Sequence, residues 1–176
     1  ADSAVEFSRA ITIATQLAKK YPELPEYAYS LSSVLNDKGV LLSNTNQNPA
    51  AVAEYVRARE VLEQLTRDHP DSPDYASSLA NQYDNLGSTH RKMGQLGEAA
   101  EALNQAITVS RRLVDEYPES PSHAVGLAMA YKNRADVHRD NRQLGPADKA
   151  LEQQRMIYER LVKDYPDEFD YIRRLV

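Results

Sequence analysis

Residues Pro73–Pro118 decide the fold, and they read PDYASSLANQYDNLGSTHRKMGQLGEAAEALNQAITVSRRLVDEYP. Two helical patterns are joined here by the short segment Gly94-Gln95-Leu96-Gly97. The first pattern has six residues that step by 4, 4, 3, 4 and 3 and therefore share one helix face: Tyr75, Leu79, Tyr83, Leu86, His90 and Met93. The second pattern has a matching stripe: Ala99, Leu103, Ala106, Leu113 and Tyr117. A connection this short predicts two antiparallel helices, whose apolar faces one hairpin cannot bury alone.

The hairpin is one copy of a repeat. Shifting the sequence by 48 residues aligns it with itself without an insertion. Prolines, small residues and leucines then fall into register: Pro22, Pro70, Pro118 and Pro166; Gly39, Gly87 and Ala135; Ala51, Ala99 and Ala147; Leu17, Leu65, Leu113 and Leu161. A fixed period of about 20 to 50 residues is typical of a solenoid, in which each unit buries its apolar face against its neighbours.

The register predicts a single all-α solenoid over residues 1–176. Residues 1–21 match the second helix of a preceding hairpin, and residues 170–176 match the start of a further first helix. The complete hairpins are expected at these ranges: 25–69, 73–117 and 121–165. We therefore expect seven helices and a short eighth, and a fragment of a longer protein.

Composition restricts the function. The chain has 176 residues, 41% of them hydrophobic, and a formal net charge of −5. This acidic balance argues against nucleic-acid binding, which needs clustered Lys and Arg. No apolar run approaches the roughly 18 residues of a membrane span. The sequence contains no cysteine, which excludes disulfides and thiolate chemistry, and we expect a cytoplasmic protein.

No motif for catalysis or for a cofactor emerges. His138-Arg139-Asp140 copies the opening of a kinase catalytic loop, but Gly145 stands where that loop needs Asn. His90 and His138 occupy the same position in neighbouring units, but no third ligand completes a metal site at a suitable spacing. We therefore expect no enzyme activity, no cofactor and no metal.

The middle unit resembles a tetratricopeptide repeat. That family has the pattern Trp-x2-Leu-Gly-x2-Tyr, then Ala-x3-Phe, then Pro, over about 34 residues. This chain has Tyr83-x2-Leu86-Gly87-x2-His90, then Ala99-x3-Leu103. The spacing of 12 residues from Gly87 to Ala99 recurs in both neighbouring units. The resemblance implies a right-handed α-solenoid of antiparallel helix hairpins.

The repeat departs from the family in its length. Its period of 48 residues exceeds that of the family by about 14, close to two turns added to each helix. Similar long-helix arrays occur in kinesin light chains and in some bacterial signalling proteins, beside a kinase or another effector domain. The resemblance implies a protein-interaction module or scaffold.

The resemblance also implies where a partner binds. In such arrays the first helix of each hairpin lines a concave groove that takes a peptide, a helix or a loop. The candidate residues lie opposite the apolar stripe of the first helices: Asn36, Asp37, Asn81, Asp84, Asn85, Ser88, Arg91, Lys92, Lys132, Asn133, Asp136 and Arg139.

Two asparagines in this set allow two interpretations. Asn85 and Asn133 occupy the same position, at which the family often uses Asn to bond the backbone of a bound peptide. An amide offers both a donor and an acceptor, which suits that role. The alternative is that these amides tie adjacent helices together.

The cations in the set also allow two interpretations. Arg91, Lys92, Lys132 and Arg139 favour a partner with an acidic segment or a C-terminal carboxylate. The alternative is a solvated face with ion pairs between helices, since three carboxylates lie nearby in the pattern: Asp84, Asp136 and Asp140.

Two functions of other classes remain open. One is a structural spacer or self-assembly module, whose apolar ends at Phe7, Ile13 and Tyr171–Val176 stack on other copies. The other is a regulatory segment of a larger signalling enzyme.

Overall fold

The computed structural model describes residues 2–175, with side chains from Val5 onward, and this range contains eight helices and no strand. Ala1 and Val176, at the ends of the expected domain, lie outside the described residues. The helices in chain order are α1 (Asp2–Lys20), α2 (Pro25–Asn44), α3 (Asn48–Asp68), α4 (Pro73–Lys92), α5 (Leu96–Glu116), α6 (Pro121–Asp140), α7 (Leu144–Asp164) and α8 (Phe169–Leu175). Within the described range, no helix is long and apolar enough to cross a membrane.

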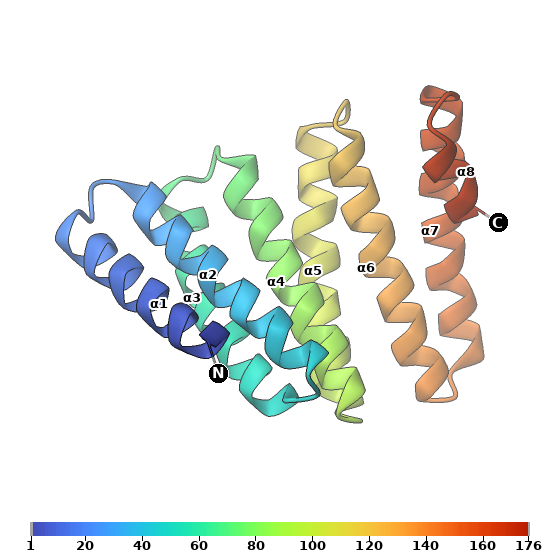
Figure 1. Ribbon diagram of the computed structural model, residues 1–176. Helices are drawn as coiled ribbons and strands as arrows, with labels where there is room; N and C mark the ends of the chain where they lie inside the picture. The colour runs from blue at the N-terminus through green and yellow to red at the C-terminus, as the bar shows by residue number, and fades with distance from the viewer. Residues whose placement is uncertain (1, 176) are drawn as a thin grey trace.

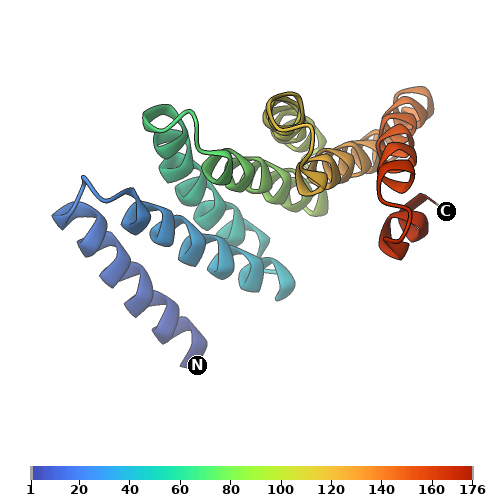
Figure 2. The same ribbon diagram turned by 90° about the horizontal axis from the view of Figure 1, so that it is seen from above.

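The helices form a solenoid, which confirms the expected fold class. Each helix packs against the next along the chain, from α1 to α8 (Figure 1). Seen from above, α2, α4, α6 and α8 form one row, and α3, α5 and α7 form another (Figure 2). Within the first row, α4 also contacts α2 and α6 directly. A row of first helices is therefore the surface that several hairpins share.

The three hairpin turns have one backbone geometry. Asn46, Gly94 and Arg142 adopt positive φ angles of 60°, 74° and 56°. In the middle turn the N–H of Gln95 donates to the carbonyl of His90 at 3.0 Å, which satisfies an acceptor at the end of α4. The turn thus reverses the chain while capping the first helix.

Close approach of the two helices in a hairpin depends on glycine. A Cβ atom placed on Gly39 would lie 2.5 Å from Cε1 of Tyr55. One placed on Gly87 would lie 2.5 Å from Cγ of Leu103 and 3.2 Å from the carbonyl oxygen of Ala99. The bulky side chain of the second helix therefore rests directly on the backbone of the first.

Aromatic pairs span the loops between hairpins. Each pair joins the residue directly after a helix to a residue of the following first helix, with ring centroids 5.6 to 6.3 Å apart. The pairs are Tyr21–Tyr27, His69–Tyr75, Tyr117–His123 and Tyr165–Tyr171. His69 and His123 thus serve as packing aromatics in positions that are otherwise occupied by Tyr.

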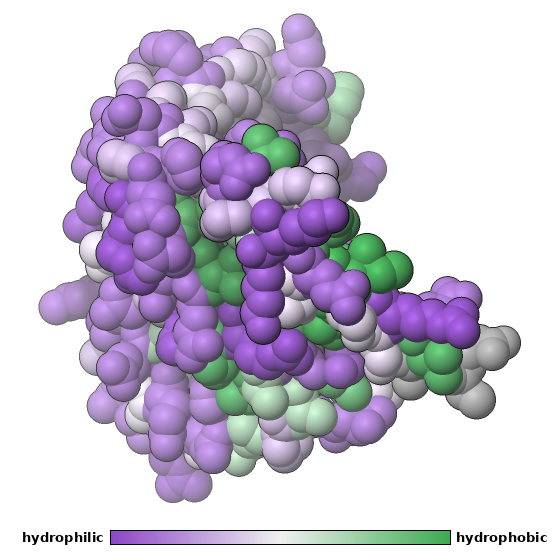
Figure 3. All heavy atoms as spheres, turned by 90° about the vertical axis from the view of Figure 1, so that its left-hand side faces the viewer, coloured by the Kyte–Doolittle hydropathy of each residue, from purple (hydrophilic) through white to green (hydrophobic). Residues whose placement is uncertain are grey.

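The outer face of α1 carries exposed apolar side chains. Val5 is 55% exposed and Ile13 is 57% exposed, whereas Ile11 packs against Leu35 of α2. Viewed from the side on which α1 lies, apolar residues form an interrupted band among polar ones (Figure 3). Phe7, which the sequence also assigns to the apolar face, is half-buried.

The packing at Gly87 predicts an asymmetric result for two glycine substitutions. Gly87→Ala and Gly126→Ala both place alanine inside a helix, so they gain the same helix propensity. Only Gly87→Ala crowds a neighbour, because a Cβ on Gly126 meets no described atom within 4 Å. We expect the free energy of unfolding of Gly87→Ala to lie about 1 to 3 kcal/mol below that of Gly126→Ala.

Urea unfolding followed by circular dichroism measures this difference. Equal stability of the two variants would contradict the direct contact between Leu103 and the backbone of α4.

Candidate functional site

A polar hollow of about 380 Å³ lies on the row of first helices. Most of its lining comes from α2 and α4, with one residue each from α3 and α6. The lining residues are Ser32, Ser33, Asn36, Asp37, Leu62, Ser78, Asn81, Gln82, Asp84, Asn85 and Met129. The hollow combines serine, amide and carboxylate groups with two apolar side chains.

Amide hydrogen bonds tie α2 to α4 beside the hollow. Oδ1 of Asn36 accepts from Nε2 of Gln82 at 2.8 Å and from Nδ2 of Asn85 at 3.0 Å. Nδ2 of Asn36 donates to Asp37 at 3.3 Å. Asn36 therefore fixes the rotamers of two side chains on the neighbouring first helix.

A carboxylate ties α4 to α6 in the same way. Nδ2 of Asn133 donates to both carboxylate oxygens of Asp84, at 2.9 and 2.7 Å. Burial raises the pKa of Asp84, against the opposing effects of the Asn133 hydrogen bonds and the charge of Lys132. The nitrogens of Asn85 and Asn133 thus hold adjacent helices together, as one of the two sequence interpretations expected.

Three of the four cations, Arg91, Lys132 and Arg139, form a basic group that is paired with carboxylates in this structure. Arg91 contacts Asp140 at 2.9 Å across α4 and α6. Lys132 contacts Asp136 at 2.7 Å, and Arg139 approaches the same carboxylate at 3.8 Å. These pairs reduce the positive charge that this end of the row presents to a partner.

The remaining two candidates of α4 lie beside this group. Nζ of Lys92 donates to Oγ of Ser43 on α2 at 2.8 Å. Ser88 is half-buried. Both lie on the row of first helices without lining the hollow.

The structure brings five of the twelve candidates to the hollow: Asn36, Asp37, Asn81, Asp84 and Asn85. The sequence analysis missed Gln82 and the three serines of the lining. Ser78 precedes Asn81 and Gln82 by 3 and 4 residues, and Ser33 precedes Asn36 and Asp37 by the same steps. Extending the polar stripe by one helical turn could have found these serines.

This geometry agrees with a comparison against known families. The family model of the tetratricopeptide repeat matches residues 79–123, from the middle of α4 to the start of α6. The chain contains a tetratricopeptide-type repeat. Its fold is similar to that of BtubC (BKLC) from P. vanneervenii, with a TM-score of 0.63 and 16% sequence identity.

The likeness to BtubC covers 91% of this chain and 59% of that one, so the chain spans less than two thirds of that structure. At this identity the likeness concerns the fold. A comparison with curated proteins gives no match.

Two histidines, His90 and His138, bond residues of the hairpin turns. Nδ1 of His90 lies 2.7 Å from Oε1 of Gln95, and Nδ1 of His138 lies 2.8 Å from Oε1 of Gln143. Among the described residues, no group of three or more His, Cys, Asp or Glu could hold a metal ion. The repeated position of these two histidines follows from the repeated turn.

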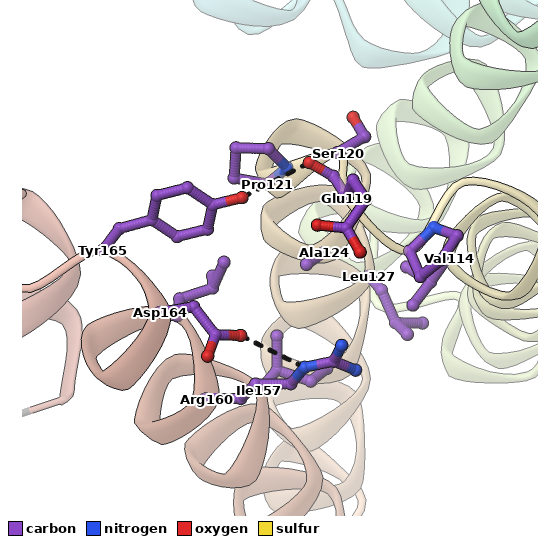
Figure 4. Close-up of a pocket in the computed structure, with 12 residues that line it drawn as sticks. Val114, Glu119, Ser120, Pro121, Ala124, Leu127, Ile157, Arg160, Asp164 and Tyr165 are labelled. Carbon is purple, nitrogen blue, oxygen red and sulfur yellow. Dashed lines mark hydrogen bonds and ion pairs between the residues drawn. The ribbon is translucent and has the colours of Figure 1, made fainter.

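A larger cavity of about 570 Å³ lies at the far end of the array, between the start of α6 and the end of α7. Its walls include Leu127 and Ile157, and the close-up shows two paired polar groups at its rim (Figure 4). Arg160 contacts Asp164 at 3.4 Å, and the hydroxyl of Tyr165 donates to the carbonyl of Glu119 at 3.3 Å. This cavity lies away from the polar residues of α2 and α4.

The burial of Asp84 predicts a pH effect on stability. Because its pKa is raised in the folded state, the folded chain holds this proton more tightly than the unfolded chain. The stability of the wild type relative to Asp84→Asn should therefore decrease as pH rises through the interval from the ordinary Asp value of 3.8 to the raised value.

Urea unfolding of both proteins at several pH values tests this effect. Asn133→Ala should raise the pKa of Asp84 in the folded state further, because it removes hydrogen bonds that favour the ionised carboxylate. The pH interval over which the relative stability decreases should then become wider. A relative stability that increases with pH would mean that these hydrogen bonds and Lys132 outweigh the burial.

Proposed function

We propose that this array is a protein-interaction module that binds a peptide segment, helix or loop of a partner along the row formed by α2, α4 and α6. The observation that carries the proposal is the polar hollow on this row. It is open to solvent at Asn81 and Asp37, both of which are exposed. A segment lying across the first helices can contact several repeats at once.

The bonds between neighbouring first helices support this proposal. Asn36, Asn85, Asp84 and Asn133 hold one another in fixed rotamers before any partner arrives. A site that is ordered in advance loses less conformational entropy on binding. We expect a short peptide to bind with an affinity of about micromolar order, which corresponds to about −8 kcal/mol.

The twelve candidate residues have two roles in this proposal. The five that line the hollow contact the partner. The others border the row or hold it in shape through the contacts described above: Ser88, Arg91, Lys92, Lys132, Asn133, Asp136 and Arg139. All-helical repeat folds of this type are typically non-enzymatic scaffolds.

The absence of cysteine from the sequence allows a direct test of where a partner binds. Peptides that bind the chain are selected from a library of random 12-residue peptides displayed on phage and then synthesised. Asn81→Cys carries a benzophenone label in the proposed groove. The matched control, Asn104→Cys, carries the label at an exposed position of α5 in the other row.

Irradiation should cross-link the peptides to the label at position 81 much more than to the label at position 104. Mass spectrometry locates the cross-link. Equal cross-linking at both positions, or preference for position 104, would contradict groove binding.

Self-association is a second candidate function, favoured by the exposure of Val5 and Ile13 on α1. Isolated exposed apolar residues are common, but these two lie on one face with Arg9 between them. If copies stack through this face, the mass measured by light scattering will rise with concentration, and Ile13→Asp will abolish the rise. A constant monomeric mass would exclude this function.

A further inference from the structure

We propose that the hollow between α2 and α4 receives a basic side chain, Lys or Arg, from the bound segment. This inference rests on the proposed function and specifies the chemistry of the partner. It points to a partner of opposite charge from the acidic segment that the sequence suggested.

The serine hydroxyls around the hollow are engaged in hydrogen bonds within the protein. The hydroxyls of Ser32 and Ser33 both donate to the carbonyl of Tyr29, at 2.7 and 3.1 Å. The hydroxyl of Ser78 shares a hydrogen bond with that of Tyr29 at 3.0 Å. A hydroxyl that donates internally still offers oxygen lone pairs. The serines therefore offer acceptors to the hollow, which suits a ligand that donates.

Gln82 provides an acceptor that lacks a partner. Its side chain lines the hollow and is only 4% exposed, and its Nε2 is fixed by the hydrogen bond to Asn36. Its Oε1 is buried and has no hydrogen-bond partner among the residues that the structure describes. An unsatisfied buried acceptor costs about 1 to 3 kcal/mol, and a donor placed in the hollow offsets that cost.

The charge of the hollow determines which donor fits best. Asp37 and Asp84 line it, and within the described chain no Lys, Arg or His does. The charge of Lys132 acts on Asp84, but its ammonium bonds Asp136 at 2.7 Å. Two carboxylates and a buried amide oxygen favour a cationic donor over a neutral one.

The shape of the hollow also fits such a side chain. Leu62 of α3 and Met129 of α6 give it two apolar walls, and Met129 is 44% exposed. Lys and Arg have apolar stems that bury along such surfaces while the charged end reaches polar groups. The combination of apolar walls and acceptors matches both parts of a basic side chain.

The cations elsewhere on the row of first helices are compatible with a hollow that prefers a cationic side chain. Arg91 and Lys132 are already paired with Asp140 and Asp136 at 2.9 and 2.7 Å. A partner carboxylate would have to compete with these pairs, whereas a partner cation enters a hollow that lacks one.

The test uses peptides from the phage selection that cross-link at position 81. They should share a Lys or Arg, and replacing it by norleucine should weaken binding to the wild type by about tenfold or more. Fluorescence anisotropy measures the dissociation constants. In Asp37→Asn/Asp84→Asn the same peptide change should have much less effect, since the two losses act on one interaction.

Two further variants make the comparison specific. Asp115→Asn/Asp148→Asn removes two exposed carboxylates from α5 and α7 and should keep the full dependence on the basic residue. Asp37→Asn alone changes only an exposed residue, so it reports on the hollow even if the double variant is less stable.

The outcomes separate the two proposals. Peptides that cross-link at position 81 without a shared basic residue, or whose basic residue is insensitive to Asp37 and Asp84, would overturn the charge preference and leave groove binding intact. A selection that yields no peptide cross-linked at position 81 would overturn both.

Discussion

The contact on which the structure depends is the one between a small residue on the first helix of each hairpin and a bulky side chain of the following second helix. Leu103 rests on Gly87, and Tyr55 rests on Gly39. A methyl group on either glycine would lie 2.5 Å from the neighbouring side chain. In the third hairpin Ala135 occupies the same position and is fully buried. This packing sets the separation of the two rows of helices, and the apolar faces are buried as hairpins stack.

Stacking leaves polar residues of the first helices facing one another. Among the described residues, hydrogen bonds between neighbouring first helices join five pairs of residues 49 positions apart: Tyr29–Ser78, Asn36–Asn85, Ser43–Lys92, Asp84–Asn133 and Arg91–Asp140. The hairpins begin 48 residues apart, at Pro25, Pro73 and Pro121, so each contact is shifted by one residue from strict equivalence. In two of these pairs the shift brings a donor to a carboxylate: Asn133 to Asp84, and Arg91 to Asp140.

The fold could be predicted from the sequence because its signals are local and repeated. The steps of 3 and 4 residues, the prolines at the helix starts and the small residues at Gly39 and Gly87 each follow from helix geometry or helix packing. The choice between the two interpretations of Asn85 and Asn133 could not be made from the sequence. Their amides bond Asn36 and Asp84 on the neighbouring helices, and that depends on the distance and the one-residue shift between first helices. Neither quantity can be read from a single repeat.

The charge that the row of first helices presents to a partner also depends on contacts between helices. The cations along the first helices left two interpretations open, an acidic partner or ion pairs between helices, because the pattern alone does not show that Asp136 and Asp140 pair with them. Asn36 also fixes the amide of Gln82 through Nε2, and Oε1 of Gln82 has no partner within the described chain, which a sequence pattern does not show. The partner group that we propose for the hollow is therefore a cation, whereas a count of cations on the first helices points to an anion.

A crystal structure of this chain with a selected peptide tests the account most directly. We expect the peptide to lie across α2, α4 and α6, with a Lys or Arg nitrogen within hydrogen-bonding distance of Oε1 of Gln82 and of Asp37 or Asp84. A peptide bound to the row of α3, α5 and α7, to the exposed face of α1 at Val5 and Ile13, or to the cavity beside Tyr165 would contradict the account.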